Sequence, residues 1–328
     1  MYKAAVIGCG RIGFEFDFDA KRDFIASHVG AYVNSKMIEL SAVCDKDSKK
    51  VKRCADSAQV PAYLDAEDML VAEEPHIVSI CTPPDSHLEL VRLAVKHGVK
   101  GIFCEKPISE SVRDAREMIT LCKKNEVILQ IGFQRRFCRA HYGIKRQIDD
   151  GLLGEPLNAT GIYTSGILNS GSHMLDLLLL YFNTPKMLRG YSSKKLSHKP
   201  GDANYDVFLR YRDDFVCSLH ACDSNDYQMF ELDMLFTKGR IRIVECGLSM
   251  ELYAIADSER YSTYKEPRLY NIIQTDLSKD FMVRAVNHLA NCVATGHESI
   301  SNGISALKGL KLVKWIVYSA EHNREVVL

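Results

Sequence analysis

The stretch KAAVIGCGRIG, Lys3 to Gly13, joins a short apolar run to a cluster of glycines. After Lys3, the residues up to Ile7 form a continuous apolar run, which predicts a buried β-strand at Lys3–Ile7. The turn that follows consists of Gly8, Cys9, Gly10, Arg11, Ile12 and Gly13. Glycines at a strand end permit a tight turn and let backbone N–H groups approach a pyrophosphate at a helix N-terminus. Because the same pattern also fits a simple turn, its context has to decide between the two.

Further strands and helices alternate through the first third of the chain. Short apolar runs predict strands at Glu39–Cys44, His76–Cys81, Gly101–Cys104 and Val127–Ile131, and helical patterns lie between them at Asp65–Glu73, His87–His97 and Val112–Asn125. Alternating elements of this kind imply βαβ units, and therefore a parallel sheet covered on both faces. We predict an N-terminal, doubly wound, Rossmann-like domain.

Asp45, at the end of the second predicted strand, is the candidate ribose-binding acid. In dinucleotide-binding domains this acid lies about 20 residues beyond the glycines, and Asp45 lies about 12 residues further than that. We attribute the surplus to an inserted loop at Phe14–Ser27, ahead of a helix at His28–Asn34. A carboxylate at this position binds a ribose 2′-hydroxyl and repels a 2′-phosphate, which favours NAD over NADP. The alternative is an aspartate that only forms a turn.

Two further strand ends carry candidate site residues. The third strand ends in CTPPDSH, Cys81 to His87, and the fourth ends in Glu105-Lys106-Pro107. Ligands of open α/β sheets bind beyond the carboxyl ends of strands, so both turns are expected beside the glycine turn. Lys106 becomes a candidate for chemistry because a φ-fixing proline follows it directly after a buried strand. The alternative is an ordinary solvated lysine.

After about residue 137 the pattern changes to successive strands. Strands are predicted at Val207–Arg212, Phe215–Ala221, Phe230–Phe236 and Arg240–Glu245, and helices at Lys279–Ala294 and Ala306–Glu321. Connections this short predict antiparallel pairing. The predicted fold class is therefore α/β, with a parallel Rossmann-like domain at residues 1–123 and an α+β domain with a mainly antiparallel open sheet at residues 124–328. The second domain is expected to bind substrate and to form a homo-oligomer through its sheet.

Composition excludes several classes of function. The 42 basic and 42 acidic residues balance, so there is no basic excess of the kind that binds nucleic acid or acidic lipid. Eleven scattered cysteines show no zinc spacing, which predicts reduced thiols and no metal site. No apolar run approaches the ~20 residues of a membrane span. We expect a cytoplasmic protein whose partner is a small molecule.

Three polar residues interrupt the apolar stretch LNSGSHMLDLL, Leu168 to Leu178. Asn169, His173 and Asp176 are spaced i, i+4 and i+7, which places them on one face of an α-helix. Each would be destabilising in a buried helix without a hydrogen-bonding partner. They therefore form either a satisfied network in the core or part of an active site.

Taken together, these motifs resemble the Gfo/Idh/MocA family of oxidoreductases, named for glucose–fructose oxidoreductase and inositol dehydrogenase. The resemblance rests on GCGRIG, CTPPDSH, EKP, GFQRRF at 132–137 and GSHMLD at 171–176. It implies that the dinucleotide is lined by the glycine turn (Gly8, Gly10, Arg11, Ile12, Gly13), Asp45, Thr82, Pro83, His87, Glu105 and Gln134. It also implies that Lys106 contacts both the substrate hydroxyl and the nicotinamide ribose. Many members carry an acid where this chain has Asn169, in a D-x-x-x-H-x-x-D pattern.

The expected chemistry is oxidation of an alcohol by hydride transfer. A base must take the hydroxyl proton, and His173 suits that role because histidine titrates near neutral pH. Lys106 would stabilise the developing alkoxide. Arg136, Tyr163, Asn169 and Asp176 are the candidate substrate contacts.

Members with Asn at the first position resemble dehydrogenases of nucleotide-linked N-acetyl-hexosamines. We therefore predict an NAD-dependent dehydrogenase acting at C3 of a UDP-linked sugar. One alternative is an enzyme acting on a free sugar or inositol. The other is a non-catalytic, NAD-binding regulator, which retention of both Lys106 and His173 disfavours.

Overall fold

The computed structural model describes residues 1–212 and 215–328, which form two compact units. Unit 1 comprises Met1–Phe137 and Ser278–Leu307, and unit 2 comprises Cys138–Leu277 and Lys308–Leu328. This grouping differs from the predicted division after residue 123. Strand β6 (Ile128–Ile131) pairs with a strand of the parallel sheet, and a helix from the C-terminal part of the chain packs on the same sheet.

The sheet of unit 1 is parallel, as predicted, and it has six strands, one more than the five that the sequence predicted. Its strands are β1 (Tyr2–Ile7), β2 (Ile38–Cys44), β3 (Ala62–Tyr63), β4 (Ile77–Ile80), β5 (Gly101–Cys104) and β6, in the order β3-β2-β1-β4-β5-β6. Strand order reverses between β1 and β4. Ligands of doubly wound folds bind beyond the carboxyl ends of the strands at such a reversal.

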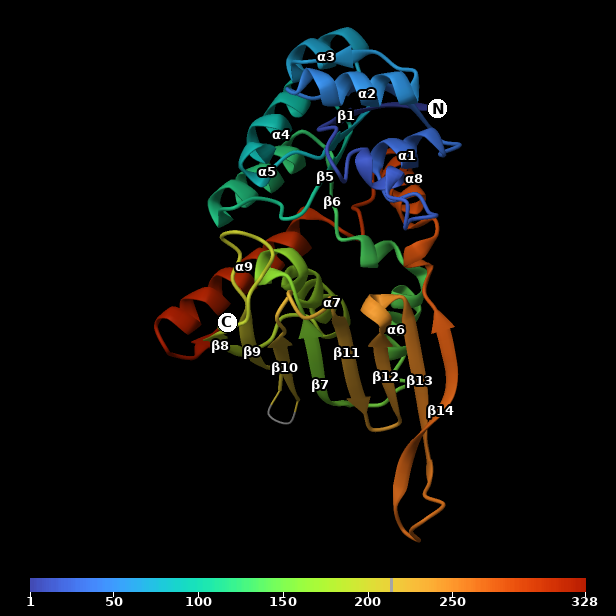
Figure 1. Ribbon diagram of the computed structural model, residues 1–328, viewed down its shortest axis with the longest axis vertical. Coiled ribbons are helices and arrows are strands. Elements are labelled where there is room, and N and C mark those ends of the chain that lie inside the picture. Colours follow the sequence, from blue (N-terminus) through green and yellow to red (C-terminus); the bar gives the residue numbers. More distant parts are fainter. Residues whose placement is uncertain (213–214) are drawn as a thin grey trace. The chain divides into compact units, whose positions relative to one another are not determined.

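Helices cover both faces of this sheet (Figure 1). They are α1 (His28–Val33), α2 (Ser48–Ala58), α3 (Ala66–Glu73), α4 (His87–Lys96), α5 (Val112–Lys124) and α8 (Phe281–Thr295). Buried side chains of α1, α2 and α8 share one apolar cluster with β1 and β2, whereas α4 packs against α3 and α5. Helix α8 approaches closely at Gly101, where a Cβ would lie 2.7 Å from Val293 Cγ2.

Unit 2 contains a nine-stranded mixed sheet. Its strands are β7 (Pro156–Tyr163), β8 (Met187–Ser192), β9 (Tyr205–Arg210), β10 (Val216–Ala221), β11 (Phe230–Phe236), β12 (Gly239–Val244), β13 (Ser249–Asp257), β14 (Lys265–Gln274) and β15 (Val326–Val327). They lie in the order β14-β13-β12-β11-β7-β10-β9-β8-β15. The β13–β14 hairpin extends beyond its neighbours in Figure 1.

The predicted antiparallel pairing of successive strands is correct for β9 with β10 and for β11 with β12. It is wrong between β10 and β11, because β7 lies between them and pairs parallel with β10. The β7 strand precedes β10 by more than 50 residues, so local connection lengths could not reveal this pairing.

Helices α6 (Arg139–Asp149), α7 (Ser172–Phe182) and α9 (Gly303–Glu321) complete the chain. Buried residues of α7 form one core with the nine-stranded sheet. At Gly161 of β7, a Cβ would lie 3.2 Å from the Met174 sulfur of α7, so the missing side chain permits this close packing.

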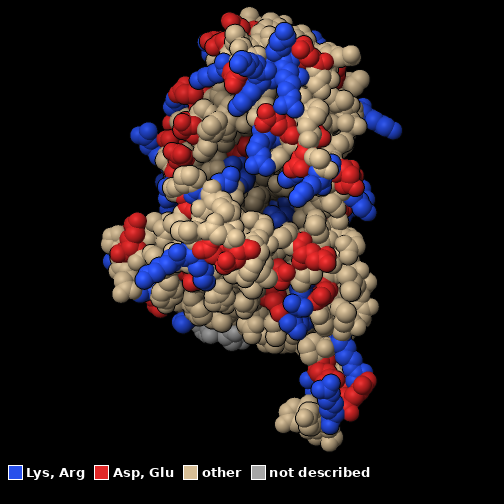
Figure 2. Space-filling model, in the orientation of Figure 1, with Lys and Arg blue, Asp and Glu red and all other residues tan. Residues whose placement is uncertain are grey.

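Acidic and basic side chains are intermixed on the face drawn in Figure 2. All eleven cysteines are free thiols, and ten are at least partly buried. In residues 1–212 and 215–328, no helix has the length and apolar character needed to cross a membrane.

Candidate active site

The glycine turn after β1 shows why each glycine is needed. Gly8 has a φ of +101°, and a Cβ there would lie 2.8 Å from the Cys81 carbonyl carbon. A Cβ at Gly13 would collide with the Gly8 carbonyl oxygen. At Gly10, in contrast, a Cβ would meet no atom within 4 Å. Packing of the turn therefore excludes side chains at Gly8 and Gly13, whereas Gly10 leaves backbone open to a ligand, which fits a dinucleotide pyrophosphate.

Asp45 follows β2 and is bound to the glycine turn. Its Oδ2 accepts a hydrogen bond from the Cys9 N–H at 2.7 Å, and its Oδ1 accepts one from the Asp47 N–H at 2.9 Å. Each carboxylate oxygen retains a further lone pair for a ribose hydroxyl. The position and the remaining acceptor capacity both fit the predicted ribose acid.

The inserted loop interrupts the first turn of the helix that follows the glycines. His28 N–H donates to Ile12 O at 3.1 Å, and Val29 N–H donates to Gly13 O at 3.0 Å. In an uninterrupted α-helix these bonds join residues i and i−4, so the loop adds 12 residues, as the position of Asp45 predicted. Asp17 closes the loop because its Oδ1 accepts hydrogen bonds from the N–H groups of Ala26 and Ser27.

The turns after β4 and β5 are joined by His87. Its fully buried ring lies 2.9 Å from Thr82 O through Nε2 and 3.2 Å from Ile108 O through Nδ1. The Thr82 hydroxyl lies 2.7 Å from Ser86 Oγ, and Pro83 precedes the short 3₁₀ turn Pro84–Ser86. The geometry thus favours a structural role for His87, in which its ring links the two turns, over the predicted contact with the dinucleotide.

Glu105 and Lys106 directly follow β5, at the carboxyl edge of the sheet. Lys106 is half-buried, and the bond between it and Pro107 is cis. Glu105 Oε1 lies 3.1 Å from His28 Nε2, and its Oε2 accepts the Lys106 N–H at 3.2 Å. Because Lys106 lies in unit 1 and His173 in unit 2, the catalytic pairing of the two remains a prediction.

The thiols near this edge are not poised for chemistry. Burial raises the pKa of Cys81 and Cys104 well above the ordinary thiol value, and the nearby Glu105 carboxylate raises both further. Both thiols therefore stay neutral, and nucleophilic catalysis by either is disfavoured.

Two predicted residues lie in the 3₁₀ turn Gln134–Phe137 of unit 1. Gln134 is half-buried. The Arg136 guanidinium is buried and donates through Nη1 to Ile300 O at 2.9 Å. That contact gives Arg136 a part in holding the segment before α9, beside its predicted role in substrate binding.

The polar stripe of unit 2 does not lie on one regular α-helix. Residues Gly166–Gly171 form a π-helical turn, and α7 begins only at Ser172. Asn169 is therefore on the π turn, whereas His173 and Asp176 are on α7. The prediction that all three lie on one regular α-helix is wrong for Asn169. Single π turns occur often at functional sites.

Asp202 stabilises the π turn and was not recognised in the sequence. Its Oδ1 accepts the Leu168 N–H and its Oδ2 accepts the Asn169 N–H, both at 2.8 Å. Gly166 precedes them, and a side chain there would collide with the Asp202 carboxylate. The backbone that carries the Asn169 side chain is therefore held in place by two hydrogen bonds to Asp202.

The other predicted residues of unit 2 differ in burial. His173 is half-buried, and Asp176 is only 2% exposed. Tyr163 is fully buried in β7, where its hydroxyl donates to Tyr205 O at 2.7 Å and accepts the Tyr205 N–H at 3.0 Å. Burial raises the pKa of Tyr163. These contacts favour a packing role for Tyr163 over the predicted contact with substrate.

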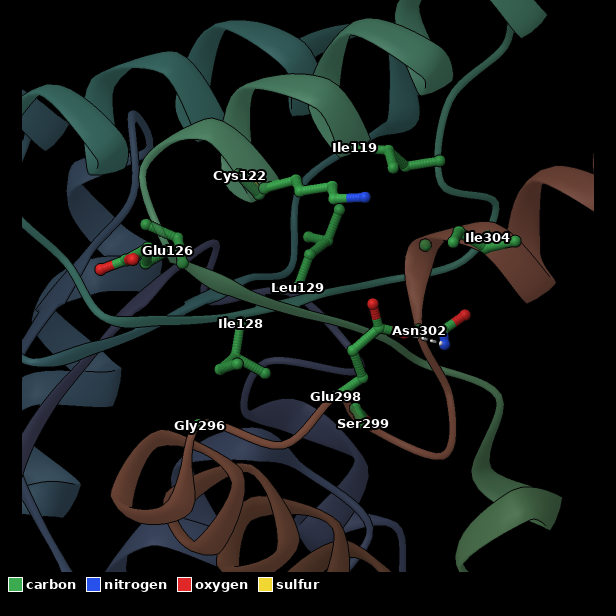
Figure 3. Close-up of a pocket in the computed structure, with 13 residues that line it drawn as sticks. Ile119, Cys122, Glu126, Ile128, Leu129, Gly296, Glu298, Ser299, Asn302 and Ile304 are labelled. Carbon is green, nitrogen blue, oxygen red and sulfur yellow. Dashed lines mark hydrogen bonds between the residues drawn. The ribbon is translucent and has the colours of Figure 1, made fainter.

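A cavity of about 510 Å³ lies elsewhere in unit 1 (Figure 3). Its lining includes Ile119 and Cys122 of α5, Ile128 and Leu129 of β6, and, from the segment before and at the start of α9, Gly296, Glu298, Ser299, Asn302, Gly303 and Ile304. None of its lining residues is a predicted site residue. The candidate site therefore rests on the strand ends and not on this cavity.

Comparison with known proteins identifies the type of nucleotide-binding domain. Residues 2–133 match the model of an oxidoreductase family, NAD-binding Rossmann fold, which is the N-terminal domain of Gfo/Idh/MocA proteins. Over residues 2–133, the chain therefore carries the NAD-binding domain of the Gfo/Idh/MocA family. The predicted family and enzyme class are thereby confirmed, and the protein is an NAD(P)-dependent oxidoreductase.

Other Gfo/Idh/MocA proteins resemble the chain over different extents. D-apiose dehydrogenase of Paraburkholderia graminis is 26% identical, with 100% of this chain and 90% of the relative covered. Myo-inositol 2-dehydrogenase of Thermotoga maritima is 33% identical over 47% of this chain and 42% of its own length. Among solved structures, WlbA dehydrogenase from Bordetella pertussis, in complex with NADH and UDP-GlcNAcA, has a TM-score of 0.79 at 19% identity and covers 100% of this chain and 98% of its own. At that identity, the likeness shows the shared fold.

Proposed function

We propose that the protein oxidises a ring hydroxyl of a sugar or cyclitol with NAD as the hydride acceptor. The observation that carries the proposal is the glycine turn with Asp45 bound to it, because the two together suit the pyrophosphate and ribose of NAD. The dehydrogenases of apiose and inositol among its relatives support the substrate class.

In the proposed mechanism, His173 takes the proton of the substrate hydroxyl while the Lys106 ammonium stabilises the developing alkoxide. The carbon then loses its hydrogen with the electron pair of that bond, and a carbonyl group forms. Bound NAD supplies the acceptor for this hydride. Asn169 and Asp176 are proposed to hold the neighbouring substrate hydroxyls, and Asp202 is proposed to keep Asn169 in place.

NAD is favoured over NADP on charge. An ionised Asp45 would repel a 2′-phosphate, and the neighbouring Lys46 is exposed, which leaves its charge largely screened by solvent. The half of the dinucleotide that carries the nicotinamide would then lie toward β4 and β5, where Thr82, Glu105 and Lys106 are found.

The finer choice of substrate rests on Asn169. Its resemblance to enzymes with N-x-G-S-H-x-x-D favours C3 of a UDP-linked N-acetyl-hexosamine, whereas the apiose dehydrogenase aligned along the whole chain favours a free sugar. A panel of UDP-hexosamines, free pentoses and hexoses, and inositols, each incubated with NAD while reduced nicotinamide is followed, tests the proposal. Turnover of one class identifies the substrate type. If NAD binds but every class stays unreacted, the proposed function is wrong.

Assembly into a homo-oligomer through the nine-stranded sheet remains a proposal. The sheet carries ion pairs between its neighbouring strands β11, β12 and β13, with Arg240 bound to Asp233 and Arg242 to Glu251 at 2.8 Å. Light scattering at several protein concentrations measures the subunit number. A monomer at all concentrations would refute this part of the proposal.

A further inference from the structure

A chain of four hydrogen-bonded side chains crosses the interior of unit 1 and ends at Glu105. The Tyr32 hydroxyl of α1 lies 2.7 Å from Ser79 Oγ of β4, and Ser79 Oγ lies 2.8 Å from His28 Nδ1. His28 Nε2 then lies 3.1 Å from Glu105 Oε1. Tyr32, Ser79 and His28 are all buried, whereas the Glu105 side chain is 12% exposed.

The connectivity of this chain determines where its protons lie. In the described part of the chain, Ser79 Oγ is the only hydrogen-bond partner of the Tyr32 hydroxyl. Burial raises the pKa of Tyr32, so its hydroxyl stays protonated and must donate to Ser79. The single Ser79 proton is then left for His28 Nδ1.

His28 must consequently accept at Nδ1 and donate at Nε2, which is the neutral imidazole. A charged imidazolium would place two donors on Ser79 Oγ, and the Ser79 proton would have no acceptor among the described residues. With the neutral form, every proton of the chain is paired and the last one points at the Glu105 carboxylate.

Glu105 is held from two other directions as well. The Lys106 N–H donates to its Oε2, and Gly132 lies so close that a Cβ there would be 2.5 Å from Oε1. The carboxylate is therefore confined at the carboxyl end of β5. In the doubly wound fold the ribose acid after β2 marks the adenosine side, so the β5 end belongs to the nicotinamide side.

We propose that His28 is a positioning residue that orients the Glu105 carboxylate by donating to it from Nε2–H, in a tautomer set by Tyr32 and Ser79. The inference rests on the proposed function for the identity of the ligand at this edge. An ionised Glu105 favours the positively charged, oxidised nicotinamide over the neutral, reduced one. His28 thereby contributes to the preference of the site for NAD⁺ over NADH.

The tautomer can be measured without any ligand. Two-bond ¹H–¹⁵N spectra of the labelled, full-length protein should show His28 with an unprotonated Nδ1 and a protonated Nε2, the signals being assigned by their loss in His28→Gln. The pattern should survive Tyr32→Phe, because Ser79 still donates, and change in Ser79→Ala. An imidazolium or an Nδ1–H tautomer in the wild type would overturn the proposal, whether or not NAD binds.

The effect on binding separates positioning from simple packing. His28→Leu removes the donor, and we expect the Kd for NAD⁺ to rise roughly 10-fold and that for NADH by less than about 3-fold. His28→Gln retains an N–H donor and should restore the wild-type ratio of the two Kd values, with thermal unfolding as the check on folding.

Equal weakening of both forms in His28→Leu, or failure of His28→Gln to restore the ratio in a folded protein, would refute the role assigned to His28. If the wild type binds neither NAD⁺ nor NADH, the proposed function fails instead, while the tautomer measurement still tests the hydrogen-bond chain.

Discussion

Replacing Gly10 by alanine separates cofactor binding from folding, because the same replacement at Gly13 disturbs the folded turn itself. An added Cβ at Gly10 meets no atom within 4 Å, whereas one at Gly13 collides with the Gly8 carbonyl oxygen. Gly10→Ala should therefore change the free energy of unfolding by less than about 1 kcal/mol. Gly13→Ala should lower it by about 1–3 kcal/mol.

Gly10→Ala should weaken NAD binding even though it leaves the free energy of unfolding nearly unchanged. If the pyrophosphate lies against the Gly10 backbone, the new methyl group overpacks the complex at a cost of about 1–3 kcal/mol, which corresponds to a Kd roughly 5- to 150-fold higher. Calorimetric titration with NAD gives the Kd, and thermal unfolding of the same samples gives the stability.

Gly143→Ala is the matched control, since a Cβ at Gly143 of α6 also meets nothing within 4 Å and the residue belongs to unit 2. It should slightly stabilise the helix and leave the Kd for NAD unchanged. A Gly10→Ala protein that binds NAD as tightly as the wild type would show that no ligand approaches this turn, and the argument from the glycines would fail.

Three further substitutions test other parts of the site. Asp45→Asn keeps an acceptor for the Cys9 N–H but removes the charge, so we expect unchanged thermal stability and roughly 10-fold weaker discrimination against NADP, measured as the ratio of Kd values. His173→Ala should leave NAD affinity unchanged and lower turnover by about 100-fold, and survival of turnover in a kinetic assay would assign the residue to structure. Asp202→Ala removes the acceptor of two N–H groups in the π turn and should lower the free energy of unfolding by about 1–3 kcal/mol, measured by denaturant titration. The stability of Asp202→Asn should lie between those of Asp202→Ala and the wild type.

The parallel sheet could be predicted because each of its strands is recognisable from its own apolar sequence. Buried parallel strands are apolar on both faces, so runs such as Gly101–Cys104 stand out without any knowledge of their neighbours. The length of the inserted loop was likewise predictable, since the spacing from glycine turn to ribose acid is set by one helix and one strand. Helix α2 was missed, because its buried face consists of the small or short residues Val51, Cys54 and Ala55.

Features that depend on distant partners could not be predicted. The π turn at Asn169 exists because Asp202, more than 30 residues later, accepts its backbone N–H groups. A 3.6-residue periodicity assumes the regular helix that this contact alters. The role of His28 is similar, since its partners Ser79 and Glu105 are brought to it only by the sheet. One signal was available, namely a histidine and a tyrosine spaced i and i+4 on a helix otherwise rich in small apolar residues.

The packing of α8 on the parallel sheet makes the order of synthesis relevant to folding. The ribosome completes β1 to β6 and then about 150 residues of intervening chain before it supplies the helix that covers β5. At ordinary translation rates that delay is roughly 7 to 30 s. During this interval, the surfaces of β5 and β6 that α8 later covers are without that helix, and the nascent chain is exposed there to aggregation or to capture by chaperones that bind apolar surface. A fragment ending at Phe137 would remain in that condition permanently, so expression of the nucleotide-binding part requires Ser278–Leu307 to be supplied with it.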